Sequence, residues 1–327
     1  MELLEKLTQC GSVSGEEQAI SALISEALSE FEQYTDALGN LIVHKKGTGK
    51  TILFAAHMDE IGIMVTYLEK NGFLRFSNIG GLYTKDLLGR RVRFANGRIG
   101  VIGTESENKN RTMGKMYIDI GAESKEEAEK IVSVGDTAYF VGEFVDQGHT
   151  ILSKALDNRA GCYALIRAAK EIKTENDLYF VFTVQEEVGL RGARTAAFGI
   201  DADKTVDYAI AVDVTDTGDT PNGEKMAVSL GKGAAIKVMD HSVICDHTVR
   251  EMLVALAKEK SIPYQLEIMT DGGTDAGTIH LTRGGIRTGG ISIPTRYIHS
   301  PSELLDKCDL NAVIALIKAF AEIKREK

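Results

Sequence analysis

Short, strongly apolar runs alternate with segments of helical periodicity over much of this chain. Thr51–Ala56 and Leu178–Val184 are almost wholly apolar, which is typical of strands buried on both faces of a sheet. The predicted elements that follow residue 150 are a helix over 158–170, a strand over 178–184, a helix from about Arg191, a strand over Tyr208–Val212, a helix over 247–260, a strand over 264–269, a helix from about Asp275, a strand over 287–293 and a helix over 310–325. This alternation predicts an α/β fold, with a mixed sheet flanked by helices.

The first fifty residues carry two local signals. Ser14-Gly-Glu-Glu17 has the capping-box pattern, and apolar residues follow it at helical spacing, so we expect an amphipathic helix to begin near residue 15. A hairpin-like pair of short strands is expected around Gly39-Asn40.

Between residues 67 and 151 the pattern changes to many short β-like runs. Asn96-Gly97 separates two of them and is a type I′ hairpin signal, and Ser124–Glu127 is a second capping box. We therefore predict a β-rich domain over 67–151, inserted into an α/β domain formed by residues 1–66 and 152–327.

Composition restricts the class of protein. A net charge of −9 over 327 residues leaves no basic stripe for nucleic acid or for an anionic membrane surface. The four cysteines are widely spaced, and the chain has no apolar stretch near the ~20 residues that would span a bilayer. We expect a cytoplasmic protein with reduced thiols and no processing.

Side chains that bind metals follow several of the predicted strands. These candidates are His57, Asp59, Asp157, Glu186, Glu187, Asp213 and His299. The carboxyl ends of neighbouring strands meet at one edge of an α/β sheet, so residues far apart in sequence can converge there. Any one of them alone is more often a cap or a turn residue, and it is their joint occurrence after apolar strands that favours a site.

Two imidazoles and three carboxylates suit a pair of divalent ions such as zinc or cobalt, with one carboxylate bridging them. Two acids then remain. Asp59 can accept the second ring N–H of His57, and Glu186 can take a proton from a water that the metals activate.

The other candidate groups have weaker support. His44, His149, His241, His247 and His280 are expected to be structural or at the surface, because none directly follows a buried strand. Cys162 has no adjacent base, which favours a structural thiol. The glycine-rich Asp271–Asp275 lacks a phosphate-loop pattern and is expected to bring backbone close to the site, with Asp275 capping the next helix.

Six motifs occur in order: His57–Gly62, Ala155–Cys162, Val184–Ala193, Asp213–Pro221, Gly273–Ala276 and Arg296–Pro301. Together they resemble the cocatalytic di-metal aminopeptidases of the glutamyl and deblocking type, a family known for TET-type tetrahedral assemblies. The resemblance covers the whole chain, the insertion included.

The resemblance implies a di-zinc peptidase-like fold, short peptides as substrates and a role for each candidate residue. His57 and Asp213 would bind one metal, Glu187 and His299 the other, and Asp157 would bridge both. Glu186 would be the general base and Asp59 the partner of His57. The inserted domain would make dimer contacts, and six dimers would form a dodecamer. Two departures, Asn158 and Ala234 where relatives often have Asp and Pro, bear on loop shape and substrate preference.

Three alternatives remain at this point. A carboxylate-dependent, endoglucanase-like glycosidase would use Glu186 but leave the histidines idle, and the chain has no tryptophan to stack on sugars. A non-catalytic peptide-binding assembly protein would not need Glu186. A di-metal carboxypeptidase or deacetylase would lack the insertion. Arg191, Arg287 and Arg296 would favour acidic first residues if they faced the substrate.

Overall fold

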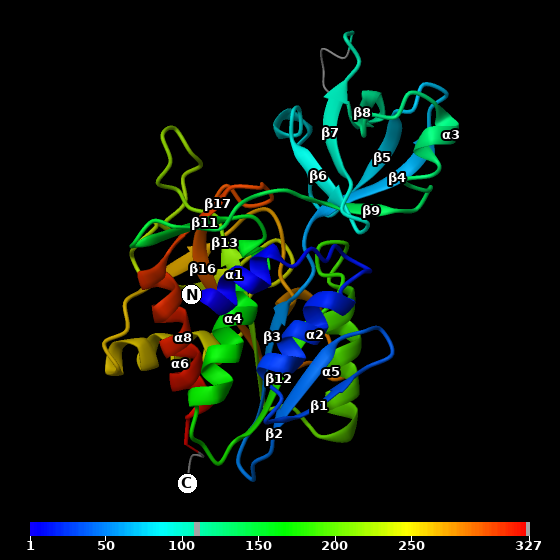
Figure 1. Ribbon diagram of the computed structural model, residues 1–327. Coiled ribbons are helices and arrows are strands. Elements are labelled where there is room, and N and C mark those ends of the chain that lie inside the picture. Colours follow the sequence, from blue (N-terminus) through cyan, green and yellow to red (C-terminus); the bar gives the residue numbers. More distant parts are fainter. Residues whose placement is uncertain (108–111, 325–327) are drawn as a thin grey trace.

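The apolar strands meet in an eleven-stranded sheet in the computed structural model, which describes residues 1–107 and 112–324 (Figure 1). Nine strands follow one another across it in the order β1-β2-β12-β3-β13-β16-β17-β11-β10, while β14 pairs with β16 and with β15. The bounds are β1 (Glu32–Thr35), β2 (Leu41–Lys45), β3 (Thr51–His57), β10 (Val145–Asp146), β11 (Thr150–Ser153), β12 (Asp177–Thr183), β13 (Tyr208–Thr215), β14 (Ala234–Met239), β15 (Tyr264–Ile268), β16 (Thr288–Arg296) and β17 (Glu303–Asp306).

The centre of the sheet is parallel and its margins are antiparallel. β12, β3, β13 and β16 run in parallel, whereas β2 and β17 pair antiparallel to this group. All residues of β3 and β12 are buried, as their continuous apolar sequences predict. The sheet is mixed, so the predicted fold class is confirmed.

Helices cover both faces of this sheet (Figure 1). The apolar residues of α1 (Glu2–Gln9), α2 (Gln18–Ala27), α4 (Leu156–Glu171), α6 (His247–Glu259) and α8 (Lys307–Ala321) contribute to one core with the sheet. The smaller core on the opposite face includes residues of α5 (Arg191–Asp203) and α7 (Ala276–Ile279). The strands therefore lie between two apolar layers.

A closed β-barrel stands apart from the sheet and has its own apolar core (Figure 1). Its strands are β4 (Gly62–Leu68), β5 (Leu74–Ile79), β6 (Arg91–Phe94), β7 (Ile99–Thr104), β8 (Met116–Asp119) and β9 (Thr137–Phe140), with the short helix α3 (Lys125–Ala128) between the last two. The barrel strands run from Gly62 to Phe140, and the chain returns to the large sheet at β10. The first strand begins five residues before the expected start at residue 67, and the last ends eleven residues before the expected end at residue 151.

Two local expectations differ from the structure, and one helix was not expected. The helix expected near residue 15 begins at Gln18, and Ser14 does not cap it. The N-terminal helix α1 was not predicted. The hairpin at Asn96-Gly97 forms between β6 and β7, but only Gly97 of the two has a positive φ, 85°, so its turn is not type I′.

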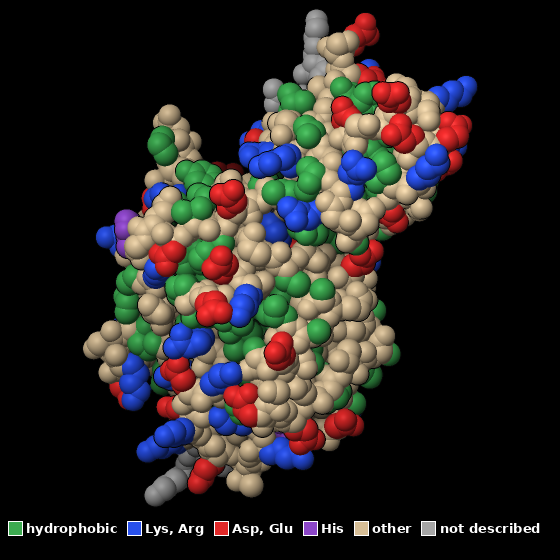
Figure 2. Space-filling view, viewed as in Figure 1, with side chains coloured by type: hydrophobic (Ala, Val, Ile, Leu, Met, Phe, Trp, Pro, Cys, Tyr) green, Lys and Arg blue, Asp and Glu red, His purple; other side chains and the backbone are tan. Residues whose placement is uncertain are grey.

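Other expectations on local structure are confirmed. Ser124 caps α3 by accepting a hydrogen bond from the Glu127 N–H, and β1 and β2 form the expected antiparallel pair. The last helix, expected over 310–325, instead spans Lys307–Ala321, and residues 322–324 are not helical; residue 325 itself lies outside the described residues. Acidic and basic side chains are interspersed over the face in Figure 2. Within 1–107 and 112–324, no helix has both the length and the apolar character to cross a membrane.

Candidate metal centre

Five of the candidate residues form two overlapping groups at the carboxyl edge of the sheet. One contains His57, Asp157 and Asp213, and the other contains Asp157, Glu187 and His299. In each group one ligand atom per residue lies within 4.8 Å of the others. Four strands and the start of one helix position these side chains: His57 ends β3, Glu187 follows β12, Asp213 lies in β13, His299 follows β16 and Asp157 lies at the start of α4.

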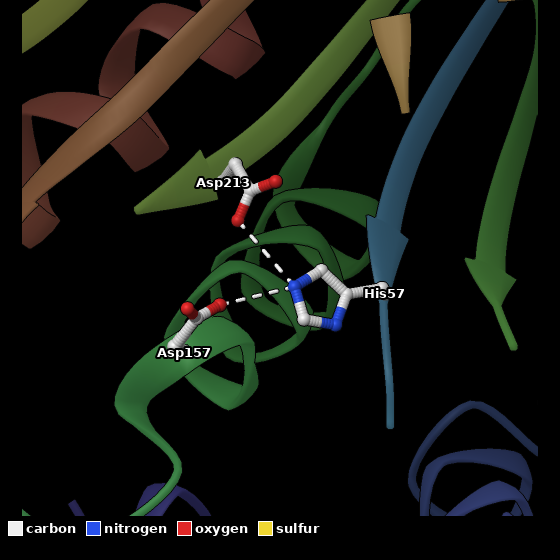
Figure 3. A group of neighbouring side chains, drawn as sticks. All are labelled: His57, Asp157 and Asp213. Carbon is white, nitrogen blue, oxygen red and sulfur yellow. Dashed lines mark hydrogen bonds and ion pairs between the residues drawn. The ribbon is translucent and has the colours of Figure 1, made fainter. Parts of the chain in front are cut away.

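The first group is buried and points inward from three separate elements (Figure 3). His57 Nε2 lies 3.0 Å from Asp157 Oδ1 and 3.6 Å from Asp213 Oδ1. All three ligand atoms therefore face one small space.

The second group uses the other carboxylate oxygen of Asp157. His299 Nε2 lies 3.4 Å from Asp157 Oδ2 and 3.2 Å from Glu187 Oε2. Since each oxygen of Asp157 faces a different imidazole, its carboxylate is placed between the two groups. That arrangement is the one a bridging carboxylate needs.

Glu186 lies beside the first group without belonging to it. Its Oε2 atom is 3.9 Å from His57 Nε2, whereas the side chain of the next residue, Glu187, joins the second group. Adjacent residues that leave a strand thus direct their carboxylates to different places.

Asp59 is fully buried behind His57 and holds the backbone of the two glutamates. Its Oδ1 accepts the Glu186 N–H at 3.1 Å and its Oδ2 accepts the Glu187 N–H at 3.2 Å. The His57 Nδ1 atom is nearer to the backbone oxygen of Asp59, at 3.2 Å, than to its carboxylate, at 3.5 Å. The backbone carbonyl is therefore the better acceptor for the second ring N–H of His57.

Charges in this cluster shift one another's protonation. Burial alone would lower the pKa of His57, but the carboxylates of Glu186 and Asp213 raise it well above its usual value. Burial raises the pKa of Glu186 well above the usual range, and Asp213 adds to this while His57 opposes it. Burial would also raise the pKa of Asp157, yet hydrogen bonds from His299 and His57 lower it. Without cations, protonated imidazoles provide the positive charge that the buried carboxylates require.

The residues fit a pair of divalent cations. Glu187 Oε1 is buried and has no hydrogen-bond partner within the described part of the chain. A buried carboxylate oxygen left in this state costs free energy unless something binds it. The donor set of imidazoles and carboxylates is one that zinc or cobalt accepts.

Two further carboxylates at the site were not singled out as site residues from the sequence. Glu303 on β17 accepts the Asp157 N–H at 2.9 Å and the His299 N–H at 3.0 Å. Asp275 does not use its side chain to cap α7; its Oδ2 accepts the Thr183 hydroxyl at 2.5 Å. Glu303 lies in an ordinary strand sequence, so no local signal marked it. The only sequence signal for Asp275 was its position in the glycine-rich segment.

A loop of the barrel packs directly on the second group. A Cβ atom added to Gly81 would lie 2.8 Å from His299 Nδ1, and one added to Gly80 would lie 3.0 Å from Glu187 Oε2. These glycines let the backbone after β5 approach both side chains closely.

The site opens into a cleft of about 1240 Å³ between the barrel and the loops that follow β14 and β15. Leu190, Ile268 and Met269 give its wall apolar surface, and Lys85 and Arg90 on the barrel side add positive charge. The three arginines considered from the sequence do not line it. Arg296, one of these three, pairs with Asp219 at 2.6 Å.

The remaining histidines and Cys162 lie outside the two groups. His44 bonds Asp177 and stacks on Tyr179, a structural role, and His241 is exposed but lines the cleft. Burial raises the pKa of Cys162 to about 12, and its Sγ donates to the His57 carbonyl. A thiol in that state is inert, as expected.

Comparisons with known proteins agree over nearly the whole chain. Residues 39–316 match the family described as M42 glutamyl aminopeptidase. A relative from Acetivibrio thermocellus, an aminopeptidase by name, is 55% identical over 322 residues, which cover 97% of this chain and 96% of that protein.

Two solved structures of similar proteins share the fold. An aminopeptidase from the archaeon Desulfurococcus kamchatkensis is 42% identical with a TM-score of 0.93, over 98% of this chain and 94% of that one. The TET1 peptidase of Pyrococcus horikoshii, which can assemble into a tetrahedron or a large octahedral shell, is 36% identical with a TM-score of 0.86, over 98% of each chain.

Proposed function

The chain belongs to the M42 glutamyl aminopeptidase family, and from this premise we propose that it hydrolyses the N-terminal residue from short peptides, using two divalent metal ions and Glu186 as the general base. The observation that carries the proposal is the pair of ligand groups that share Asp157, with Glu186 beside them but outside both.

Each metal has its own set of ligands in this proposal. His57 and Asp213 would hold one ion and Glu187 and His299 the other, while Asp157, which belongs to both groups, would serve both ions. Zinc or cobalt suits these donors. When bound, two such ions polarise the scissile carbonyl and lower the pKa of the attacking water from about 15.7 toward about 7.

The residues of the chain then perform the proton transfers. Glu186 accepts the proton of the attacking water as the carbon–oxygen bond forms, and delivers it to the leaving amine as the peptide bond breaks. Asp59 binds the N–H groups of Glu186 and Glu187 and thereby keeps the base and the ligand apart. A base of this kind contributes about 10²- to 10⁴-fold to the rate.

Self-association is part of the proposal. The barrel has a separate core and lies at one end of the chain's fold, which leaves its outer surface available for contact with a second copy. A similar peptidase assembles into closed shells. We infer that the barrel makes the dimer contact, that dimers combine into a dodecamer and that the protein acts in the cytoplasm.

The first test measures hydrolysis of aminoacyl p-nitroanilides and of one amino-blocked control, with zinc or cobalt and again after EDTA. We expect cleavage of the free-amino substrates and not of the blocked control. EDTA should abolish this activity, and added metal should restore it. A β-glucan substrate serves as the alternative arm. If the protein cleaved the β-glucan in the presence of EDTA and did not cleave the p-nitroanilides, the glycosidase alternative would be favoured over the proposal.

The second test uses Glu186→Gln, which keeps the size of the side chain but cannot accept the proton. We expect two bound metals per chain by elemental analysis and a loss of kcat of about 10²- to 10⁴-fold. Loss of a metal from this variant would instead make Glu186 a ligand and contradict the assignment of the base.

A further inference from the structure

The N-terminal turn, residues 12–17, lies against the segment that carries Glu186 and Glu187. Its capping-box sequence does not cap α2. Glu17 Oε1 accepts the Gly15 N–H within the turn at 2.7 Å, and both polar side chains also bind residues outside the turn. Ser14 Oγ donates to Asp59 Oδ2 at 2.6 Å, and Glu17 Oε1 accepts the Gln185 N–H at 3.0 Å. Both side chains are more than 90% buried.

Three consecutive backbone N–H groups are consequently bound by carboxylates. Glu17 binds that of Gln185, and the two oxygens of Asp59 bind those of Glu186 and Glu187. The Asp59 oxygen that binds Glu187 also accepts the Ser14 hydroxyl, so Ser14 orients this carboxylate. The N-terminal turn therefore contacts the Gln185–Glu187 segment directly through Glu17 and indirectly through Ser14, which binds Asp59.

The backbone that these contacts hold is unusual. Gln185 has φ +55°, a left-handed conformation that costs a residue with a side chain free energy. This bend lies directly before Glu186 and determines where its carboxylate points. The Glu17 oxygen that accepts the Gln185 N–H helps to keep the bend in place.

The N-terminal turn is itself anchored to the body of the protein. Ser12 N–H donates to Glu60 Oε1 at 3.0 Å, and Arg159 Nη2 donates to the Ser12 carbonyl at 3.2 Å. Glu60 also pairs with Lys154 at 2.7 Å, and all three charged side chains are buried. The turn is thus a fixed support for the residues that it contacts.

We propose that Ser14 and Glu17 are positioning residues for the general base: they fix the Gln185–Glu187 backbone so that the Glu186 carboxylate faces the reacting water while Glu187 faces the metal. The inference rests on the proposed function, in which Glu186 is that base. Neither side chain is among the ligand groups, so we expect their loss to lower kcat even in chains that carry two ions.

The test compares Glu17→Ala with Glu17→Gln, both loaded with metal and normalised to chains that carry two ions. The amide oxygen of Gln can still accept the Gln185 N–H. We expect Glu17→Ala to lose about 10- to 100-fold in kcat with KM within a factor of two, and Glu17→Gln to stay near wild type. A loss of kcat in both variants, or in neither, overturns the proposal.

Asp246→Ala is the matched control. Asp246 accepts the Val249 N–H at 3.0 Å, the same length as the bond to Gln185, but it caps α6 at the opposite end of β16 from His299. We expect its kcat per folded chain to equal that of wild type. An equal loss in Asp246→Ala would mean that any broken backbone bond lowers kcat, which contradicts a positioning role.

Two further measurements keep the outcome unambiguous. Ser14→Ala removes only the hydroxyl, and an unchanged kcat in this variant contradicts the proposal even if Glu17→Ala does not fold. Wild type and Glu186→Gln are measured alongside. An inactive wild type contradicts the proposed function and with it this inference, whereas an active wild type with an equally active Ser14→Ala contradicts this inference alone.

Discussion

Glu303 makes its hydrogen bonds to the candidate centre through the backbone of two proposed ligands. It binds the N–H groups of Asp157 and His299, which face the second group from different elements. Loss of a residue that orients ligands typically weakens metal binding 10- to 100-fold. We expect Glu303→Ala to show a loss of about this size in competition titrations against a chromophoric chelator.

A second buried carboxylate provides the control for Glu303. Asp309 also accepts two backbone N–H groups, those of Gly231 and Gly233, each at 2.6 Å, but it lies outside both ligand groups. Asp309→Ala should lose folding stability and keep the metal affinity of wild type. Equal affinities in the two variants would show that Glu303 does not orient the ligands.

Asp275 gives the metal-free protein a defined dependence on pH. Burial raises the pKa of Asp275 to about 7 from an ordinary value of 3.8, although the Thr183 hydroxyl opposes the rise. Between these values the folded chain binds this proton and the unfolded chain does not, so the contribution to stability falls as the pH rises and is fully lost above about 7. The shift corresponds to roughly 4 kcal/mol at most.

Asp275→Asn removes this titration while its amide oxygen still accepts the Thr183 hydroxyl. In EDTA, the variant should therefore gain stability over wild type as the pH rises from about 4 to 7 and keep the gain at pH 8. Urea unfolding at several pH values measures the difference. A difference that stays constant with pH would mean that Asp275 is already ionised in the folded chain.

At the scale of elements, the strands and their ends were predictable from the sequence, and the loops were not. His57 ends one buried apolar strand and Glu187 follows another, so the apolar pattern and the positions of the two residues predicted that they lie near one edge of a sheet. Ser14 and Glu17 instead matched a local helix-capping pattern. Their partners, Asp59 and Gln185, are distant in sequence, and a local pattern carries no information about such contacts.

The contact between the loop after β5 and His299 could not be predicted from the sequence either. Gly81 belongs to the barrel segment, and nothing in the sequence around it indicates that its Cα lies against His299. A Cβ there would lie 2.8 Å from His299 Nδ1, closer than carbon and nitrogen atoms approach without displacement. Gly81→Ala should move the His299 ring, and elemental analysis at limiting zinc should find about one metal per chain.

The control for Gly81 is Gly114→Ala, because an added Cβ at this barrel-side position meets nothing within 4 Å. It should bind metal as wild type does. If Gly81→Ala kept two metals with the affinity of wild type, the loop and not the imidazole would have moved. The barrel would then not influence the centre through this contact.

At the scale of the whole molecule, the proposed contact between copies of the chain would use exposed apolar side chains of the barrel. Tyr67 and Val134 are 50% and 63% exposed and line one shallow groove with Lys125 and Glu129. An apolar centre with charged residues at its rim is typical of protein contacts. If the barrel forms the dimer, a carboxylate at Val134 would be buried without a partner in the interface.

We therefore expect Val134→Asp to lower the molar mass measured by light scattering after size-exclusion chromatography, with the fold and metal content unchanged. Ile244→Asp is the comparison, since Ile244 is the most exposed of the large apolar residues on the sheet domain, at 77%. A lower mass with Ile244→Asp and an unchanged mass with Val134→Asp would place the dimer contact on the sheet domain. A lower mass in Val134→Asp alone supports the barrel, because burial of an unpaired charge disrupts only the interface that contains it.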